Sequence, residues 1–420
     1  MNETVLNNFL RDGKNGLPEE FNVLSLFDGM SCGQQALERS GFVVNNYFAS
    51  EIDKYGIQVA KTNYPNTQHL GSVVNVDGTK LPKIDLLIGG SPCQSFSFAG
   101  KRKGMSTKDE QEILTLEHYL QLKSEGYEFE GQSYLFWEFM RLLGEVKPTY
   151  FLLENVMMGE KWERVLSNAI GVNAIEINSA LVSAQNRRRL YWTNIGLAPA
   201  GLFGDLESTI KQPKDKGILL KDILEKEVDE KYYISEAMIN RINRSNNAER
   251  CFETGDKSLC LAAGYYKQGR DNQYVIHNMM PRSGDPTKGG TGHLSRTDGK
   301  TYCIDTGNTN AVEIIGGDFR YDEGFRWRDG GKSGTAHTKE SCGQFAQIDH
   351  KIRRLTPTEC ERLQTVKDGY TEGVSDTQRY KMLGNGWTVD VIAHIFGYMH
   401  NANPNGFEKA NANFFNTNSR

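Results

Sequence analysis

The chain has 420 residues, and its 49 lysines and arginines against 53 aspartates and glutamates give a formal net charge of -4. A charge so close to neutral excludes a globally basic nucleic-acid binder, so any nucleic-acid contact must come from local patches. Seven cysteines, an odd number with no Cys-x-x-Cys pair, argue against a disulfide framework and a standard zinc site. With a polar N-terminus and no apolar run near the roughly 20 residues of a membrane span, we expect a cytoplasmic protein.

The first 200 residues alternate short apolar runs with helical patterns. Strands are predicted at residues 21–27, 43–49, 84–88 and 150–153, and helices at residues 34–39 and 54–63. Strands that alternate with helices predict an α/β fold with a parallel sheet.

The composition changes near residue 200. Residues 251–350 hold 16 of the 43 glycines and few helical patterns, so we interpret residues 201–349 as a loop-rich second module with short strands. Helical periodicity returns at residues 356–366 and 387–399, within a segment, residues 350–402, that is predicted to return to the first domain. Residues 403–420 are predicted to form a flexible tail.

A glycine turn follows the first predicted strand, and a carboxylate follows the second. Residues 27–33 read FDGMSCG, and Glu51 ends the second strand. Such a turn lets the backbone approach a ligand closely, and a carboxylate at this place can bind two ribose hydroxyls. A plain tight turn before a helix explains the glycines equally well.

The strand at residues 84–88 runs into Gly89-Gly90-Ser91-Pro92-Cys93-Gln94. Ligands of open α/β sheets lie at the carboxyl ends of the strands, which is where a nucleophilic cysteine is useful. A lone cysteine is more often a small buried hydrophobe. The neighbouring glycines, the proline and the motifs that follow favour the nucleophile for Cys93.

Two further motifs supply an acid and a set of arginines. Glu154 follows the fourth strand, and an acid paired with a cysteine suits addition to a pyrimidine ring, although a helix cap would explain Glu154 alone. In the run QNRRR, Arg187 and Arg189 share one face of a strand and Arg188 points to the other. Alternate arginines can contact a base and its phosphates; a solvated charge run is the alternative.

Taken in order, FDG…G, SEID, GGSPCQSFS, ENV, QNRRR, RRLTPTECERLQ and LGNGWTVDVI resemble the motifs of the C5-cytosine DNA methyltransferases over residues 21–196 and 351–397. The resemblance implies a Rossmann-like, S-adenosylmethionine-dependent sheet over residues 1–200 and a target-recognition domain over residues 201–349. It also implies that Arg354, in the RxLTPxE motif, packs the two domains together.

The resemblance implies a role for each motif residue. Cys93 is the implied nucleophile, Glu154 the acid, and Arg187 and Arg189 the arginines of the site, with Arg189 the contact to cytosine O2. The implied cofactor residues are Phe27, Gly29, Gly33, Glu51, Ile52, Ser72, Val73, Pro92, Asn385 and Gly386.

The expected reaction follows from these roles. The Cys93 thiolate adds to C6 of a flipped-out cytosine while Glu154 stabilises charge at N3, and C5 then takes the methyl group of S-adenosylmethionine. The loop at residues 94–105 is polar and basic, which suits closure over a duplex.

Three departures from the family pattern stand out. FDGMSCG replaces the usual FxGxGG and, with SEID and LGNGWTVDVI, is more similar to the animal de novo enzymes, whereas GGSPCQSFSFAG and QNRRR look bacterial or phage-like. Ser72 stands where a carboxylate usually contacts the adenine, which predicts a weaker hydrogen bond. Residues 106–130 form an acidic insertion with a predicted helix at 110–124, which we place over the catalytic face.

The second module is the expected DNA reader. Residues 231–358 contain 19 lysines and arginines against 15 aspartates and glutamates, a local charge of +4. The candidate DNA-binding residues are Gln94, Ser97, Arg282, Lys288, Arg296, Arg326 and Arg328. The expected partner is double-stranded DNA, bound by a monomer, with a cognate restriction endonuclease as a further candidate.

Three other interpretations stay open at this point. The same chemistry on transfer RNA is one, although a large glycine-rich module suits duplex DNA better. A catalytically inactive DNA-binding relative is another, supported by Ser72 and opposed by Cys93, Glu154 and the two arginines. A nucleotide-binding dehydrogenase leaves Cys93 and Glu154 unexplained, and the turn lacks a clean GxGxxG.

Overall fold

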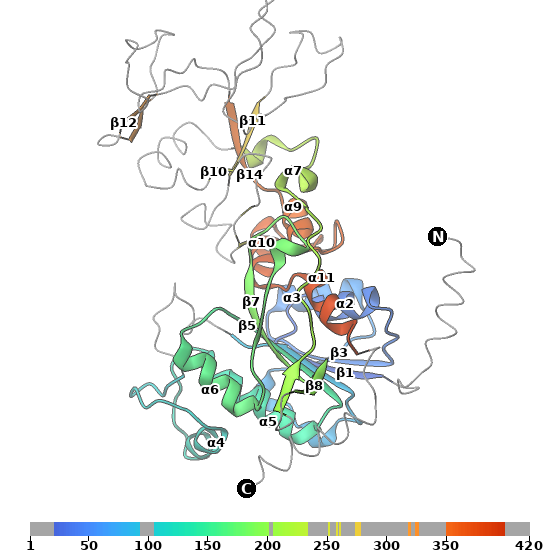
Figure 1. The fold of residues 1–420 in the computed structure, drawn as a ribbon, viewed down its shortest axis with the longest axis vertical. Helices are drawn as coiled ribbons and strands as arrows, with labels where there is room; N and C mark the ends of the chain where they lie inside the picture. The colour runs from blue at the N-terminus through green and yellow to red at the C-terminus, as the bar shows by residue number, and fades with distance from the viewer. Residues whose placement is uncertain are drawn as a thin grey trace, which may run out of the picture.

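A computed structural model describes residues 21–92, 105–200, 205–233 and 350–399, with short pieces at 251–252, 258, 260–261, 274–278, 318–320 and 324–326. Its centre is a seven-stranded sheet in the order β3-β2-β1-β4-β5-β7-β6 (Figure 1). The strands are β1 (Asn22–Leu26), β2 (Asn46–Ser50), β3 (Gln68–Gly71), β4 (Leu86–Gly90), β5 (Tyr150–Val156), β6 (Ile175–Asn178) and β7 (Arg188–Thr193).

The predicted α/β fold is confirmed, and the sheet is mostly parallel. Strands β3, β2, β1, β4 and β5 pair in parallel, whereas β7 runs antiparallel to both β5 and β6. The four strands that the sequence predicted are therefore all parallel, and the antiparallel β7 is an addition that the sequence analysis did not predict. Fewer than ten residues join β6 to β7, and so short a connection cannot make the crossover that parallel strands require.

Both faces of the sheet are covered, because side chains of one strand alternate between two apolar cores. Val23, Ile88 and Leu152 belong to one core, whereas Leu24 and Leu87 belong to the other. Helices α5 (Phe136–Val146) and α6 (Glu160–Ile170) cover the second core. This two-sided burial explains why the strands read as continuous apolar runs.

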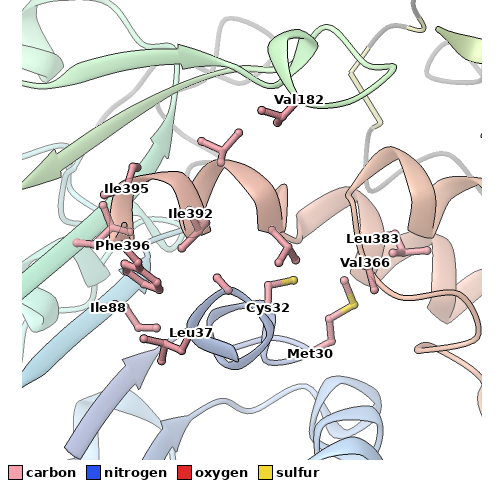
Figure 2. Packing of buried hydrophobic residues seen from close by; sticks show 14 of the residues in the cluster. Met30, Cys32, Leu37, Ile88, Val182, Val366, Leu383, Ile392, Ile395 and Phe396 are labelled. Atoms are coloured by element: carbon pink, nitrogen blue, oxygen red, sulfur yellow. The ribbon is translucent and has the colours of Figure 1, made fainter. Parts of the chain in front are cut away.

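The first core joins the two ends of the catalytic domain. Helix α2 (Cys32–Arg39) follows β1, and α11 (Val389–Phe396) packs directly on it (Figure 1). Figure 2 shows Ile392, Ile395 and Phe396 of α11 above Leu37 of α2 and Ile88 of β4. The C-terminal segment therefore completes a core that the N-terminal strands begin. Helices α9 (Pro357–Leu363) and α10 (Asp376–Asn385) precede α11, and α3 (Lys54–Asn63) has the predicted bounds.

Short elements lie among the described residues from 197 to 354, in the predicted second module and at its two borders. These are β8 (Leu197–Ala200) with β9 (Asp205–Ser208), α7 (Leu220–Ile223), β12 (Asp318–Arg320) with β13 (Gly324–Arg326), and a sheet of β10 (Cys251–Phe252), β11 (Tyr274–Asn278) and β14 (His350–Arg354). Among the described residues no helix is long and apolar enough to cross a membrane.

The RRLTPTE motif lies where this module meets the C-terminal helices. Arg354 stacks over the rings of Tyr232 and Tyr380, at 5.3 and 5.4 Å from their centroids. The fully buried arginine is Arg353 instead, which forms an ion pair with Glu359. Both arginines therefore contact residues where the second module meets the C-terminal helices. The sequence analysis named only Arg354 for this packing role and missed Arg353.

The acidic segment 106–130 is folded onto the second core. Helix α4 (Leu116–Ser124) starts six residues later than predicted, because the Thr115 hydroxyl caps it by accepting from His118 N. Tyr119 and Lys123 of α4 both bind the buried carboxylate of Glu138 in α5, at 2.5 Å. The described part of the segment thus packs beside the sheet, and none of its residues lines the cavity described below.

Candidate active site

A cavity among the described residues lies at the carboxyl ends of β1, β2, β4 and β5. It has a volume of about 610 Å³. Strands β1 and β4 are neighbours whose connections leave in opposite directions along the sheet. A crevice opens at such a switch point, which is where open α/β sheets bind their ligands. The C-terminal segment from Lys381 to Trp387 closes the other side of the cavity.

The turn after β1 is shaped for close approach to a ligand. Phe27 and Gly29 both have positive φ, at 57° and 58°. This conformation is strained for Phe27, because its Cβ crowds the backbone, but not for glycine. The Glu51 carboxylate accepts hydrogen bonds from Gly29 N at 2.8 Å, Ile52 N at 2.7 Å and Asp53 N at 2.8 Å. Three backbone amides therefore fix the orientation of this carboxylate at the cavity wall.

All ten residues predicted to bind the cofactor line this one cavity. Ile52 is 70% exposed there, an uncovered apolar side chain beside an oriented carboxylate. Asn385 is also exposed. The Ser72 side chain makes no capping hydrogen bond to the short helix that follows it.

Asp28 lies in the same turn and was not singled out from the sequence. Its carboxylate accepts a hydrogen bond from the Tyr47 hydroxyl at 2.8 Å and another from Ser31 Oγ. Burial raises the pKa of Asp28, and these hydroxyls oppose the shift only in part. The departure from the usual FxGxGG pattern thus places a half-buried acid in the turn, at the wall of the cavity.

The predicted acid lies on the strand itself. Strand β5 extends through Val156, so Glu154 is inside it, and α6 begins only after the N-cap Gly159. The helix-cap interpretation of Glu154 is therefore wrong. Glu154 is the register partner of Gly90, two residues before Pro92. The predicted acid therefore lies beside the last residue of β4, which is three residues before Cys93 in the sequence.

Both carboxylate oxygens of Glu154 are contacted. Arg189 Nε lies 3.0 Å from Oε1, and Trp387 Nε1 donates to Oε2 at 3.2 Å. Glu154 is 8% exposed, so this ion pair is shielded from solvent. Burial lowers the pKa of Arg189, but Glu154, Cys260 and Tyr191 together outweigh it, so the net shift is upward. The arginine that was predicted to contact the base is therefore held beside the predicted acid.

The three arginines divide as the strand geometry predicted. Arg188 points outward and pairs with Glu176 on β6, whereas Arg187 and Arg189 face the cavity. The Arg187 guanidinium donates to three carbonyl oxygens, those of Leu261 at 3.0 Å, Gly384 at 3.2 Å and Gly386 at 2.8 Å. The Arg187 side chain therefore connects β7 to the C-terminal motif, through Gly384 and Gly386, and to the second module, through Leu261.

Cys260 is a second residue that sequence reasoning missed. Its sulfur accepts hydrogen bonds from Arg187 Nη1 at 3.2 Å and Arg189 Nη2 at 3.7 Å. Burial raises the pKa of the Cys260 thiol, but the two arginines more than offset it, so the net shift is downward. No spacing in the sequence signals this contact, because Cys260 lies more than 70 residues from either arginine.

Several predicted residues lie outside the described part of the chain. These are Cys93, Gln94, Ser97, Arg282, Lys288, Arg296 and Arg328. Arg326 ends strand β13, and only its backbone is described.

The chain has clear relatives among known proteins. The chain matches the family model of the C-5 cytosine-specific DNA methylases over residues 21–401. It is 27% identical to the orphan methyltransferase M.SPRI of Bacillus phage SPR, over 89% of this chain and 96% of the relative. It is 25% identical to the type II methyltransferase M1.ScrFI of Lactococcus lactis subsp. cremoris, over 90% of this chain and 77% of the relative.

Solved structures share the fold. The Entamoeba histolytica methyltransferase EhMeth superposes with a TM-score of 0.57 at 14% identity, covering 91% of this chain and 99% of that one. A Spodoptera frugiperda DNMT2 mutant superposes with a TM-score of 0.51 at 17% identity, covering 90% and 99%.

The chain belongs to the C-5 cytosine-specific DNA methylase family, as its motifs predicted. It is therefore an enzyme of DNA methylation, and the dehydrogenase, inactive-relative and transfer-RNA interpretations are not favoured.

Proposed function

We propose that this DNA methyltransferase transfers the methyl group of S-adenosylmethionine to C5 of a flipped-out cytosine through a covalent bond between Cys93 and C6. The observation that carries the proposal is one arrangement at the switch point. Glu154 pairs in register with Gly90, forms an ion pair with Arg189, and shares its cavity with Pro92 and the glycine turn. Cys93 is the residue that follows Pro92.

The cavity residues suit S-adenosylmethionine. The Glu51 carboxylate is fixed by three amides, which leaves about one of its roughly four acceptor sites, on Oε2, for a ribose hydroxyl. Ile52 offers an exposed apolar surface to the adenine ring, and the Ser72 hydroxyl an acceptor to the adenine amine. The exposed Asn385 amide lies near the methionine end. When bound, the group supplies an electrophilic methyl on a sulfonium.

The residues of the chain divide the chemistry on the base. The Cys93 thiolate forms a bond to C6, and the electron pair displaced from the C5–C6 double bond makes C5 nucleophilic. Glu154 stabilises the charge that develops at N3, and Arg189 donates a hydrogen bond to O2, where negative charge also develops. After C5 gains the methyl group, water takes the C5 proton, and the C5–H electron pair re-forms the C5–C6 double bond as the Cys93 thiolate leaves C6. Arg187 holds the Leu383–Trp387 region and Leu261 in place around these groups.

The DNA contact is proposed for the second module and the loop after Cys93. The positive local charge of residues 231–358 suits phosphate binding, and arginine can read guanine bidentately in the major groove. Arg282, Lys288, Arg296, Arg326 and Arg328 remain the candidates, with Gln94 and Ser97 in the loop.

The biological setting is also a proposal. We infer a cytoplasmic monomer that acts on duplex DNA, with a cognate restriction endonuclease as its partner if the enzyme belongs to a type II system. The relatives include both orphan phage enzymes and type II enzymes by name. Light scattering of the protein with a short duplex measures the stoichiometry.

The test is base-resolution mapping of 5-methylcytosine in mixed-sequence duplex DNA after incubation with the protein and S-adenosylmethionine. We expect methylation at one short recurring sequence. Cys93→Ser should abolish it, while Cys360→Ala, at a buried cysteine in the helix α9 core, should retain it. Methylation by Cys93→Ser would overturn the covalent mechanism.

The cofactor assignment has its own test by calorimetry. Glu51→Gln removes the negative charge and one strong acceptor, so we expect S-adenosylmethionine to bind roughly 10- to 100-fold more weakly. An unchanged dissociation constant would contradict the assigned ribose contact.

A further inference from the structure

The Glu154 carboxylate is held from two directions by groups that come from different parts of the chain. Arg189 reaches Oε1 from the neighbouring strand β7, at 3.0 Å. Trp387 reaches Oε2 from the C-terminal segment, 233 residues away along the chain, at 3.2 Å. Each carboxylate oxygen thus has a donor of its own, so the plane of the carboxyl group is fixed.

Trp387 lies between the cofactor turn and the end of β4. A Cβ atom on Gly90 would come within 2.9 Å of the indole Nε1, and one on Gly33 within 3.7 Å of ring atom Cζ3. The absence of a side chain at Gly90 is therefore what admits the ring, whereas a Cβ on Gly33 would make only ordinary van der Waals contact with it. Trp387 also lines the cavity together with Phe27 and Glu51.

The backbone on both sides of Trp387 is fixed. Gly386 O accepts from Arg187 Nη2 at 2.8 Å. Thr388 is buried, and its hydroxyl donates to Gln364 Oε1 at 2.9 Å, while Val389 N donates to Gln364 O at 3.0 Å. The indole is therefore presented from a rigid support, as a positioning group requires.

An indole N–H can only donate, and a half-buried one needs an acceptor. Here the acceptor is the predicted catalytic acid, although a tryptophan used only for packing would be served by any uncharged acceptor. Trp192 illustrates that case, since its Nε1 donates to Ser167 Oγ at 2.9 Å on the far core of the sheet.

We propose that Trp387 is a positioning residue for methyl transfer, which holds the Glu154 carboxylate through its indole N–H and thereby couples the wall of the cofactor cavity to the acid. The inference rests on the proposed role of Glu154. It assigns to the WTVDVI end of the C-terminal motif a task in catalysis in addition to lining the cavity. A ligand that contacts the indole ring acts on the orientation of Glu154 through this one hydrogen bond.

The test compares Trp387→Phe with Trp192→Phe in the full-length protein. Both variants keep an aromatic ring and lose one indole hydrogen bond, but only the first bond ends on Glu154. We expect Trp387→Phe to lower kcat about tenfold, the worth of one ordinary hydrogen bond, with the calorimetric dissociation constant of S-adenosylmethionine changed less than about threefold. Trp192→Phe should leave kcat within about twofold.

A double-mutant cycle separates positioning from a general loss of structure. In a Glu154→Ala background, which has no acceptor for the indole N–H, Trp387→Phe should lower the residual kcat far less than tenfold. An equal fall in both backgrounds, or a fall no greater than that of Trp192→Phe, overturns the inference. If the wild-type enzyme methylates DNA and Cys93→Ser does not, the proposed function stands whichever way this cycle falls.

Discussion

Arg353 and Glu359 meet through two parallel hydrogen bonds of 2.7 Å, and both side chains are fully buried. The same carboxylate accepts from the Thr356 and Glu225 amides, each at 2.8 Å. This ion pair therefore joins strand β14, which contains Arg353, to helix α9, which Glu359 helps to cap. Through Glu225 it also connects both elements to the start of the second module.

Arg353→Leu should destabilise the fold strongly, because it leaves the Glu359 charge buried without its partner. We expect a loss of about 3–5 kcal/mol in the free energy of unfolding. Arg354→Leu is the matched control, since Arg354 loses only its stacking on Tyr232 and Tyr380, worth about 1 kcal/mol each at most. Chemical denaturation of both variants measures the difference, and equal losses would contradict the assignment of Arg353 as the anchor.

Arg189→Ala and Arg188→Ala test the two faces of β7. Arg189 is the donor beside Glu154, so its removal should lower kcat by about 10²-fold or more. Arg188 forms an exposed pair with Glu176, and such pairs contribute roughly 0–1 kcal/mol. Single-turnover methylation assays compare them. A silent Arg189→Ala, or an Arg188→Ala that is equally impaired, would refute the assigned faces.

Cys260→Ala should lower activity about three- to tenfold, because the sulfur that both arginines contact is lost. Cys260→Ser keeps a hydrogen-bond acceptor and should be less impaired. Steady-state kinetics on the mapped DNA site measures both variants. Identical kinetics for wild type, Ala and Ser would show that the sulfur contributes nothing to the arginine geometry.

The Cys260 contact also predicts a pH dependence of stability. Its pKa in the folded protein lies below the ordinary thiol value of 9.0, because the charges of Arg187 and Arg189 outweigh burial. A lowered pKa contributes stability that is fully present above the unfolded pKa and is lost as pH falls through the folded one. The excess stability of wild type over Cys260→Ala should therefore grow from neutral to alkaline pH. Thermal unfolding across that range measures it, and a difference that shrinks as pH rises would contradict the sign.

Gly33→Ala should destabilise the cofactor turn, because the new Cβ would come within 2.4 Å of Ile88 Cδ1. Crowding of this kind costs about 1–3 kcal/mol. Gly144→Ala, in the exposed part of helix α5 with nothing within 4 Å of the new atom, should instead stabilise the protein by up to about 1 kcal/mol. The denaturation midpoint should fall for Gly33→Ala and rise for Gly144→Ala. An unchanged midpoint for Gly33→Ala would argue against the close packing at this turn.

The sequence by itself determined which runs form the parallel strands and the order of the motifs that follow them. Apolar runs that stop at FDG, SEID, GGSPC and ENV predict a parallel sheet with its chemistry at one edge, because side chains that follow parallel strands meet there. The period of two along a strand was enough to separate Arg188 from Arg187 and Arg189. The antiparallel β7 could be anticipated only from the short β6–β7 connection.

Only the tertiary structure decided which groups contact Glu154 and the arginines. Trp387 and Cys260 lie 233 residues from Glu154 and 71 residues from Arg189, and no local pattern encodes contacts over such separations. The same holds for the buried member of Arg353-Arg354, since adjacent arginines are equivalent in sequence and differ only in which one meets Glu359. Local periodicity fixes which face a side chain takes, whereas the packing of distant segments fixes its partner.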